Sequence, residues 1–368
     1  MADPRFIPWA KPDFWGKEQE YVVEALTSTW ISGGPFVDRF ERDFAAFCGG
    51  GHVLACSNGT SALHMAYLAL GIGAGDEVVV PGFAFLAVAN IALQLGAEPV
   101  FAEVDPGTWC LCAGAVEAHI SPRTKAIVPV HTYGNVCDMD GILELAGRRG
   151  IPVVEDTAEA FASRYGGRVA GTMGTIGTFS FQATKTITTG EGGMVVTADE
   201  RLRDVMALYR SHGMLRKVFY WHELAGHNFR LTNMQAALGV AQLERIDTIL
   251  AERRRVRELY ESYLDAIDGV TRQQVTAKAE PVVWTMALKL DPRAYPQGRD
   301  SVMAQMRDAG IETRPGFRAP RQMPHIYRCP PLPISEDISR QVICLPTYPT
   351  LQNDEIQCIC ATLAGLRK

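Results

Sequence analysis

Hydrophobic and polar residues change their spacing several times along the chain, and these changes predict an order of strands and helices. From residue 53 onward, short β-branched runs alternate with longer stretches whose apolar residues recur at helical intervals. The runs that predict strands cover residues 77–80, 99–101, 126–130 and 152–155. The stretches that predict helices cover residues 61–70, 87–95 and 139–148. Such alternation is typical of an α/β domain with a mostly parallel sheet flanked by helices.

The pattern is different on either side of this region. Residues 17–48 predict a helix, a loop over 29–35 and a second helix from about Phe36. A long helical pattern covers residues 233–266, with leucine, valine and isoleucine at mostly helix-like spacing. We therefore expect helices before the α/β region and one long helix after it.

The length of the chain and a change in composition predict two domains. The chain has 368 residues, of which 47% are apolar, and this is more than one ordinary domain core needs. Beyond Gly269, proline and arginine become more frequent and regular units become harder to recognise. We expect a large α/β domain over residues 1–245, including the N-terminal helical segment, and a small C-terminal α+β domain over residues 246–368.

Charge and cysteine content exclude several classes of protein. The net charge of −5 with mixed signs does not favour a nucleic-acid binder. The N-terminal segment has prolines and charges where a signal peptide needs an apolar run, and the longest uncharged stretch, 78–97, contains proline and glycine, so we expect no membrane span. The nine cysteines are scattered, and Cys110-x-Cys112 and Cys358-x-Cys360 lack the usual zinc spacing. We expect reduced cysteines, no metal site and a cytoplasmic location.

The stretch from Cys56 to Leu63 runs from a strand-like segment through an Asn-Gly turn into a predicted helix. Thr60 or Ser61 is suited to cap this helix, and Gly59 allows close approach of a ligand. Free backbone N–H groups and the helix dipole make such a turn a candidate anion site. The alternative is an ordinary capped helix. The stretch matches neither the Walker pattern nor the Gly-x-Gly-x-x-Gly pattern.

A lysine and an acidic cluster suggest which phosphate-containing ligand the anion site would bind. Lys185 stands between two β-prone runs, 178–181 and 194–197, and is followed by Gly-Glu-Gly-Gly. Asp156 and Glu159 follow the strand predicted at 152–155, although such acids often only cap the next helix. A lysine, a carboxylate and a phosphate turn are together what pyridoxal phosphate requires. The lysine forms the Schiff base, and the carboxylate keeps the pyridine nitrogen protonated.

These motifs and others resemble the fold-type I pyridoxal-phosphate sugar aminotransferases, and among them the GDP-perosamine synthase branch. The resemblance covers almost the whole chain. It includes STWISGG, CSNGTSALHMAYLALGIGAGDEVVVP, PVHTYGNVCDMD, VVEDTAEAF, GTFSFQATKTITTGEGGMVVT, GHNFRLTNMQAALGVAQLERID and GIETRP. It implies an aminotransferase that uses pyridoxal 5'-phosphate and forms a homodimer with shared active sites.

The resemblance also implies roles for individual residues. Lys185 would bind the cofactor covalently and move protons, and Asp156 would pair with the pyridine nitrogen. Asn228 would reach the cofactor phosphate of the neighbouring subunit, although it could instead cap a turn. The other implied cofactor contacts are Gly59, Thr60 and Ser180 at the phosphate, Glu159 at the ring hydroxyl, and Phe85 against the ring, for which ordinary core packing is the alternative.

The chain departs from the perosamine branch in the segment after GIET. That branch usually reads Arg-Pro-Phe-Phe-Tyr-Pro-x-His, whereas residues 314–321 read Arg-Pro-Gly-Phe-Arg-Ala-Pro-Arg. Arg318 and Arg321 are candidates for a phosphate or carboxylate of the substrate, with solvated surface arginines as the alternative. The further candidate substrate contacts are Trp30, His227, Arg314 and His325.

We therefore expect transfer of an amino group from an amino acid, glutamate above all, to the C4 ketone of a nucleotide-linked 6-deoxyhexose. An alternative acceptor is another keto-sugar, such as an acidic sugar or a sugar-nucleoside intermediate. A sugar dehydratase of the same fold would carry histidine at position 185, which Lys185 opposes. A noncatalytic regulator is the alternative from another class, but a binding module has no need of a Schiff-base lysine.

Overall fold

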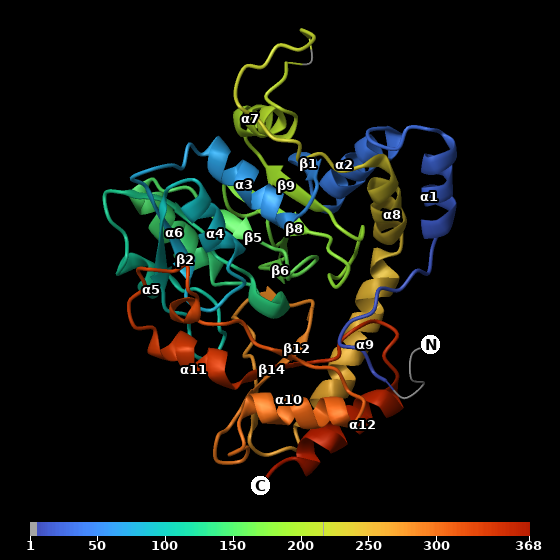
Figure 1. Ribbon diagram of the computed structural model, residues 1–368, viewed down its shortest axis with the longest axis vertical. Coiled ribbons are helices and arrows are strands. Elements are labelled where there is room, and N and C mark those ends of the chain that lie inside the picture. The colour runs from blue at the N-terminus through green and yellow to red at the C-terminus, as the bar shows by residue number, and fades with distance from the viewer. Residues whose placement is uncertain (1–5, 216) are drawn as a thin grey trace.

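The computed structural model describes residues 6–215 and 217–368. A large α/β part carries the strands near the centre of the molecule, and a smaller α+β part lies at one end of it (Figure 1). The large sheet has the order β3-β2-β4 and β5-β8-β9-β1, and the bridges Ile127–Val153 and Val130–Asp156 join β4 to β5. Its strands are β1 (His52–Cys56), β2 (Glu77–Pro81), β3 (Glu98–Ala102), β4 (Thr124–Ile127), β5 (Val154–Asp156), β8 (Ile176–Ser180) and β9 (Gly193–Thr197).

The expectation of a mostly parallel sheet is confirmed. β2 pairs in parallel with β3 and β4, and β5 pairs in parallel with β8. β9 is antiparallel to both β8 and β1. For the pairing with β8 the reason is the connection: β9 follows β8 through the loop 181–192 without a crossover helix, whereas a parallel neighbour needs a crossover connection.

Helix α3 (Gly59–Ala69) leaves the sheet directly after β1. Its N-cap is Asn58, whose side-chain oxygen accepts a hydrogen bond from Ser61 N at 2.7 Å. The expectation that Thr60 or Ser61 caps this helix is wrong, because the helix starts at Gly59, two residues before the predicted start at Ser61. The cap leaves the first N–H groups of α3 directed to the carboxyl end of the sheet.

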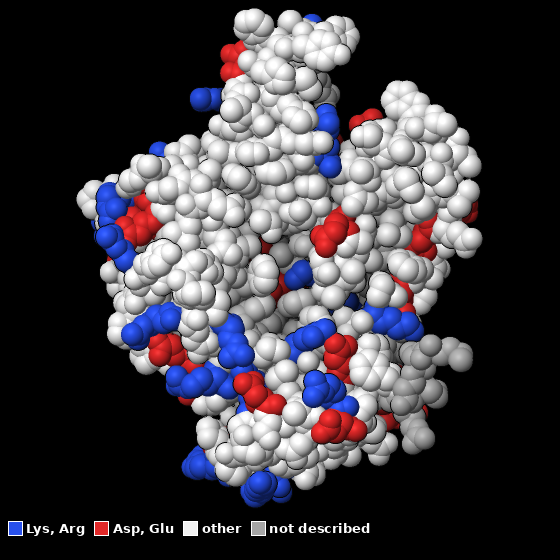
Figure 2. All heavy atoms as spheres, in the orientation of Figure 1, with Lys and Arg blue, Asp and Glu red and all other residues white. Residues whose placement is uncertain are grey.

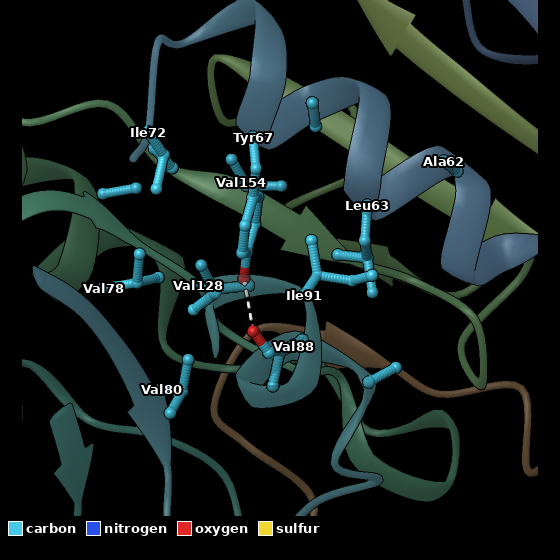
Figure 3. Packing of buried hydrophobic residues seen from close by; sticks show 14 of the residues in the cluster. Ala62, Leu63, Tyr67, Ile72, Val78, Val80, Val88, Ile91, Val128 and Val154 are labelled. Atoms are coloured by element: carbon cyan, nitrogen blue, oxygen red, sulfur yellow. Dashed lines mark hydrogen bonds between the residues drawn. The ribbon is translucent and has the colours of Figure 1, made fainter. Parts of the chain in front are cut away.

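The core of the large part lies between α3, α4 (Ala87–Gln94) and the sheet (Figure 3). Tyr67 of α3 is fully buried in it, and its hydroxyl donates to the carbonyl oxygen of Val88 at 2.9 Å. Valines of β2, Val78 and Val80, complete the packing around this ring. The other helices of this part are α5 (Ala113–Glu117), α6 (Met139–Arg149) and α7 (Glu200–Arg210).

The N-terminal helices α1 (Glu18–Thr27) and α2 (Pro35–Phe47) pack on α8 (Asn233–Glu244). The predicted long helix is in fact two helices, because the helical backbone breaks at Arg245, where φ is −105° and ψ is 14°. The second of the two is α9 (Ile246–Leu264), which leads away from the large part (Figure 1).

The small part contains an antiparallel sheet of order β10-β12-β14-β13. Its cluster of buried side chains comes from this sheet and from three helices, and it also includes Ile7 near the N-terminus. The elements are β10 (Val270–Arg272), β12 (Met286–Leu290), α10 (Arg299–Asp308), β13 (Arg314–Pro315), α11 (Pro333–Gln341), β14 (Val342–Leu345) and α12 (Asn353–Gly365). The domain division after residue 245 stays a proposal, which the separate packing of this cluster supports.

The contacts that join the two parts include the following two. Glu103, directly after β3, accepts hydrogen bonds from the N–H groups of Ile334 and Ser335 at 3.0 Å each, at the start of α11. A short sheet of β6 (Arg164–Tyr165), β7 (Arg168–Val169) and β11 (Ala279–Glu280) makes the second. Of the helices in the described part of the chain, none is long and apolar enough to cross a membrane.

Candidate active site

A cavity of about 450 Å³ opens at the carboxyl ends of β5 and β8, and the small part closes one side of it. Figure 2 shows a hollow near the centre of this face, with acidic and basic atoms visible inside it. Seven of the residues predicted from the sequence line the cavity: Gly59, Thr60, Phe85, Asp156, Glu159, Ser180 and Lys185. Segments far apart in the chain therefore meet here, because the carboxyl ends of parallel strands lie at one edge of a sheet.

Lys185 enters the cavity from the connection between β8 and β9. This connection is held by a hydrogen bond from Lys185 N to the carbonyl oxygen of Gln182 at 2.8 Å. The Nζ atom lies 3.7 Å from the centre of the Trp284 ring. Burial lowers the pKa of Lys185, and the carboxylates of Glu159 and Asp156 act in the opposite direction. The lysine is thus partly exposed to the cavity, close to two acids and an aromatic face.

Asp156 is the last residue of β5 and is only 5% exposed. Its Oδ1 accepts a hydrogen bond from Ala158 N at 3.0 Å, which fixes the orientation of the carboxylate. Burial raises the pKa of Asp156, while the Ala158 hydrogen bond and the charge of Lys185 lower it. A positively charged partner in the cavity would therefore stabilise the charged form of this carboxylate.

The neighbouring Glu155 points to the opposite face of the sheet, as alternate residues of a strand do. Its carboxylate accepts hydrogen bonds from His131 Nε2 at 3.1 Å and from Gly171 N at 2.8 Å. Cys137 N donates to His131 Nδ1 at 3.2 Å, so the proton of this ring is on Nε2. Burial alone would raise the pKa of Glu155, but these donors lower it overall. Glu155 is thus a structural anchor behind Asp156.

Glu159 follows Asp156 by three positions and lies in the same cavity. Its Oε2 accepts a hydrogen bond from Tyr133 N at 2.9 Å. Tyr133 has a left-handed backbone, with φ of 59° and ψ of 16°, which is strained for a residue with a side chain. Burial raises the pKa of Glu159 from an ordinary 4.5 to about 7, and Lys185 opposes this rise. Glu159 can therefore exchange a proton close to neutral pH.

The start of α3 and the end of β8 form a narrow cradle at one end of the cavity. Gly59, Thr60 and Ser180 line it. A Cβ atom on Gly59 would lie 2.8 Å from the Cβ of Ser180, which is too close for any other residue at this position without a shift. Backbone N–H groups at the N-terminus of a helix are suited to hold an anion.

An aromatic wall completes the cavity, and three of its four residues are not predicted from the sequence. Trp9, Trp284 and Phe317 line the cavity together with Phe85. Phe317 stacks on the buried Tyr133 at 5.1 Å and meets Phe85 edge-on at 6.1 Å. Phe85 is 61% exposed, which excludes the alternative that it is an ordinary core residue. Trp9 and Trp284 occur in no recognisable motif, whereas Phe317 stands within the unusual segment 314–321.

The other predicted residues lie outside the cavity lining. Asn228 is exposed and its backbone pairs with Ser211, and His227 stacks on Phe229 at 4.5 Å. Trp30 is 67% exposed, beyond the end of α1. Arg314 is the first residue of β13 and pairs with Glu312 at 2.6 Å. In the segment after β13, Arg318 is exposed, Arg321 pairs with Glu336 at 3.3 Å, and His325 contacts Asn90 at 2.8 Å.

Residues 13–364 match the DegT/DnrJ/EryC1/StrS aminotransferase family. The chain belongs to this family.

Characterised relatives are similar over nearly their whole length. The GDP-perosamine synthase of Caulobacter vibrioides is 44% identical, with 99% of each chain covered, and that of Escherichia coli O157:H7 is 40% identical, with 98% of each covered. Among solved structures, the aminotransferase TlmJ from Streptoalloteichus hindustanus has a TM-score of 0.93 at 31% identity, with 98% of each chain covered. The expected family, fold class, aminotransferase activity and pyridoxal phosphate cofactor are confirmed.

The residues of this DegT/DnrJ/EryC1/StrS aminotransferase fit pyridoxal phosphate. The cradle at Gly59 excludes a side chain and offers helix N–H groups to a phosphate. A buried acid, Asp156, and an amine, Lys185, line the same cavity, and its volume is in the range of cofactor sites. Among residues 6–215 and 217–368, no group of histidine, cysteine or acidic side chains is arranged to hold a metal ion.

Proposed function

We propose that the protein transfers an amino group from an amino acid, glutamate in the first place, to the C4 ketone of a nucleotide-linked 4-keto-6-deoxyhexose. One observation carries this proposal: a single cavity holds Lys185, Asp156, Glu159 and the N-terminus of α3. It does so in a chain that is 44% identical over its length to a GDP-perosamine synthase.

Lys185 is the proposed covalent anchor of the cofactor and the group that moves protons between carbon atoms. The bound cofactor supplies an aldehyde that carries the amino group and a ring that accepts electrons from the substrate carbon. Because burial lowers the pKa of Lys185, a larger share of its amine is neutral and able to accept a proton.

Asp156 is the proposed partner of the pyridine nitrogen. Its carboxylate is held by Ala158 N and is enclosed, so a protonated nitrogen would be a strong partner for it. We propose that Glu159 contacts the ring hydroxyl and that Phe85 covers the ring face. Gly59, Thr60 and Ser180 would hold the phosphate.

A homodimer with shared sites is the proposed assembly. Asn228 lies outside the cavity lining of its own chain, on an exposed segment next to α7. This position supports the proposal that its amide reaches the cofactor phosphate of a second copy. The cytoplasm is the proposed location, and all nine cysteines are free thiols, in keeping with a reducing compartment.

The acceptor sugar is the least constrained part of the proposal. Arg318 follows Phe317 of the aromatic wall and is exposed, so it is the arginine best placed to meet a substrate phosphate. Arg321 is already paired with Glu336. Trp30, His227, Arg314 and His325 stay candidates for contacts with the outer part of the substrate. A keto-sugar that carries a carboxylate is the second candidate acceptor, which Arg318 would equally suit.

A two-stage experiment tests the function. Purified protein with pyridoxal phosphate should be yellow, and glutamate alone should bleach it in a half-reaction. A panel of keto-sugar nucleotides, with and without a carboxylate, should then restore the colour, and the fastest acceptor identifies the substrate class. A protein that binds the cofactor but is not bleached by any common amino acid would contradict the proposal and favour a regulator.

A further inference from the structure

Trp284 contacts the amine of Lys185, although the two residues belong to different parts of the molecule. Trp284 lies just before β12 of the small part, and Lys185 lies in the β8–β9 connection of the large part. The Nζ atom is 3.7 Å from the centre of the indole ring. An ammonium group over an aromatic face is attracted by the negative charge of that face, most strongly over tryptophan and where water is excluded. Trp284 is only 8% exposed, whereas Lys185 is partly exposed to the cavity that both residues line.

The indole is held in place relative to the backbone of Lys185. Its Nε1 donates to the carbonyl oxygen of Thr184, the residue before the lysine, at 2.7 Å. The backbone N of Trp284 donates to the carbonyl oxygen of Tyr133 at 3.1 Å. Buried Arg253 donates from Nη1 to the Trp284 carbonyl oxygen at 3.3 Å. The ring face therefore has a fixed position relative to the backbone of the segment that carries the lysine.

Several charges share the cavity with this pair. The titratable residues that line it with Lys185 are Asp156, Glu159 and Glu191. Asp156 and Glu159 attract the ammonium group, as the ring does, whereas burial acts against its charge. The ring differs from the two acids in one respect: it is anchored to the segment that carries the lysine.

We infer that Trp284 is a positioning residue for Lys185. The ring face of Trp284 holds the protonated amine of Lys185 whenever this amine is not bonded to the cofactor. Attraction by the ring favours the charged form, so Trp284 keeps the pKa of Lys185 higher than burial alone would set it. The inference rests on the proposed covalent role of Lys185. It adds a reason why the amine stays close to the reacting atoms after its release.

The test measures the protonation of Lys185 without the cofactor. Cofactor-free protein is labelled with trace acetic anhydride between pH 6 and 11, and the peptide that contains Lys185 is quantified by mass spectrometry. Trp284→Leu removes the ring face, and Trp284→Phe keeps a ring face but removes the Nε1–H donor. Trp9→Leu is the matched control, because Trp9 lines the same cavity and meets the Trp284 ring edge-on at 5.5 Å. Urea unfolding establishes that each variant is folded, and Trp284→Met replaces Trp284→Leu if the latter is not.

We expect the labelling midpoint of Lys185 to fall by about one pH unit in Trp284→Leu. It should fall by less in Trp284→Phe and stay unchanged in Trp9→Leu. The inference is overturned if Trp284→Leu leaves the midpoint unchanged, or if Trp9→Leu lowers it equally.

A second readout separates positioning from general damage to the site. Only the neutral amine captures pyridoxal phosphate, so the capture rate in Trp284→Leu, followed by visible absorbance, should rise relative to native protein below the native midpoint. A rate that is reduced at every pH, with an unchanged midpoint, would show a purely structural role and overturn the inference. The labelling experiment needs no cofactor, so its outcome is independent of whether the proposed amino transfer is correct.

Discussion

Replacing Gly59 with alanine tests whether the start of α3 holds the cofactor phosphate. The added methyl carbon would lie 2.8 Å from the Cβ of Ser180 and 3.3 Å from its Oγ. Carbon atoms in contact prefer about 3.5–4.0 Å, so α3 and the end of β8 must separate by about 1 Å. Both segments carry proposed phosphate donors. The substitution therefore widens the cradle without removing any hydrogen-bonding group.

The expected loss of cofactor affinity follows from the number of phosphate hydrogen bonds that this shift weakens. One hydrogen bond to a charged group is worth about 1.5–3 kcal/mol, which corresponds to roughly ten- to a hundredfold in affinity. The same crowding should lower the free energy of unfolding of the cofactor-free protein by about 1–3 kcal/mol. Cofactor binding should therefore weaken by at least tenfold while the protein stays folded.

The assay is a titration of cofactor-free protein with pyridoxal phosphate and, separately, with pyridoxal, which lacks the phosphate. Gly59→Ala should weaken binding of the phosphate form much more than binding of pyridoxal. Gly114→Ala is the matched control, since Gly114 lies in the first turn of α5 and a Cβ there meets no atom within 4 Å. Equal losses for both ligands, or native affinity in Gly59→Ala, would refute the phosphate cradle.

The remaining predictions concern the acids, the lysine and the partner subunit. Lys185→Ala should stay folded but lose turnover, and borohydride should link the cofactor to Lys185 of native protein; linkage to another lysine in peptide maps would exclude the proposed role. Asp156→Asn should still bind the cofactor, while its glutamate half-reaction slows by orders of magnitude in stopped-flow records; near-native rates would remove Asp156 from its role. Because the pKa of Glu159 is raised from 4.5 to about 7, the folded protein binds more protons than the unfolded chain between these values, and its stability falls as pH rises through this window. Glu159→Gln should flatten that dependence in urea unfolding of the cofactor-free protein, and an unchanged slope would contradict the raised pKa. Mixed dimers of Asn228→Ala and Lys185→Ala should regain activity at limiting cofactor if Asn228 acts across the interface, because one of the two sites is then native; no recovery in confirmed mixed dimers would show that it acts within its own chain.

Much of the candidate site could be predicted from the sequence because its residues stand in local patterns. Lys185 lies between two β-prone runs, Asp156 ends an apolar strand, and Gly59 opens a helix. Each pattern depends on backbone geometry within a few residues, and the structure brings all three to one cavity. The cap of α3 was misassigned because Asn58, Thr60 and Ser61 all suit an N-cap, and only the backbone shows where the helix begins.

The sequence by itself determined the α/β class, the family and the residue types of the cofactor site, because strand and helix periodicity and short motifs are local properties. Only the tertiary structure shows which aromatic residues form the wall of the cavity. Trp9, Trp284 and Phe317 meet Lys185 in one cavity because the N-terminal segment and the residues next to β12 and β13 pack against aromatic residues of the large part. Aromatic residues pack in any core, so no local pattern marks these three, and their place depends on contacts between distant segments. The break at Arg245 is of the same kind: helical periodicity continues through it, and Leu243 before it and Ile249 after it pack in one buried cluster, so no local pattern marks it.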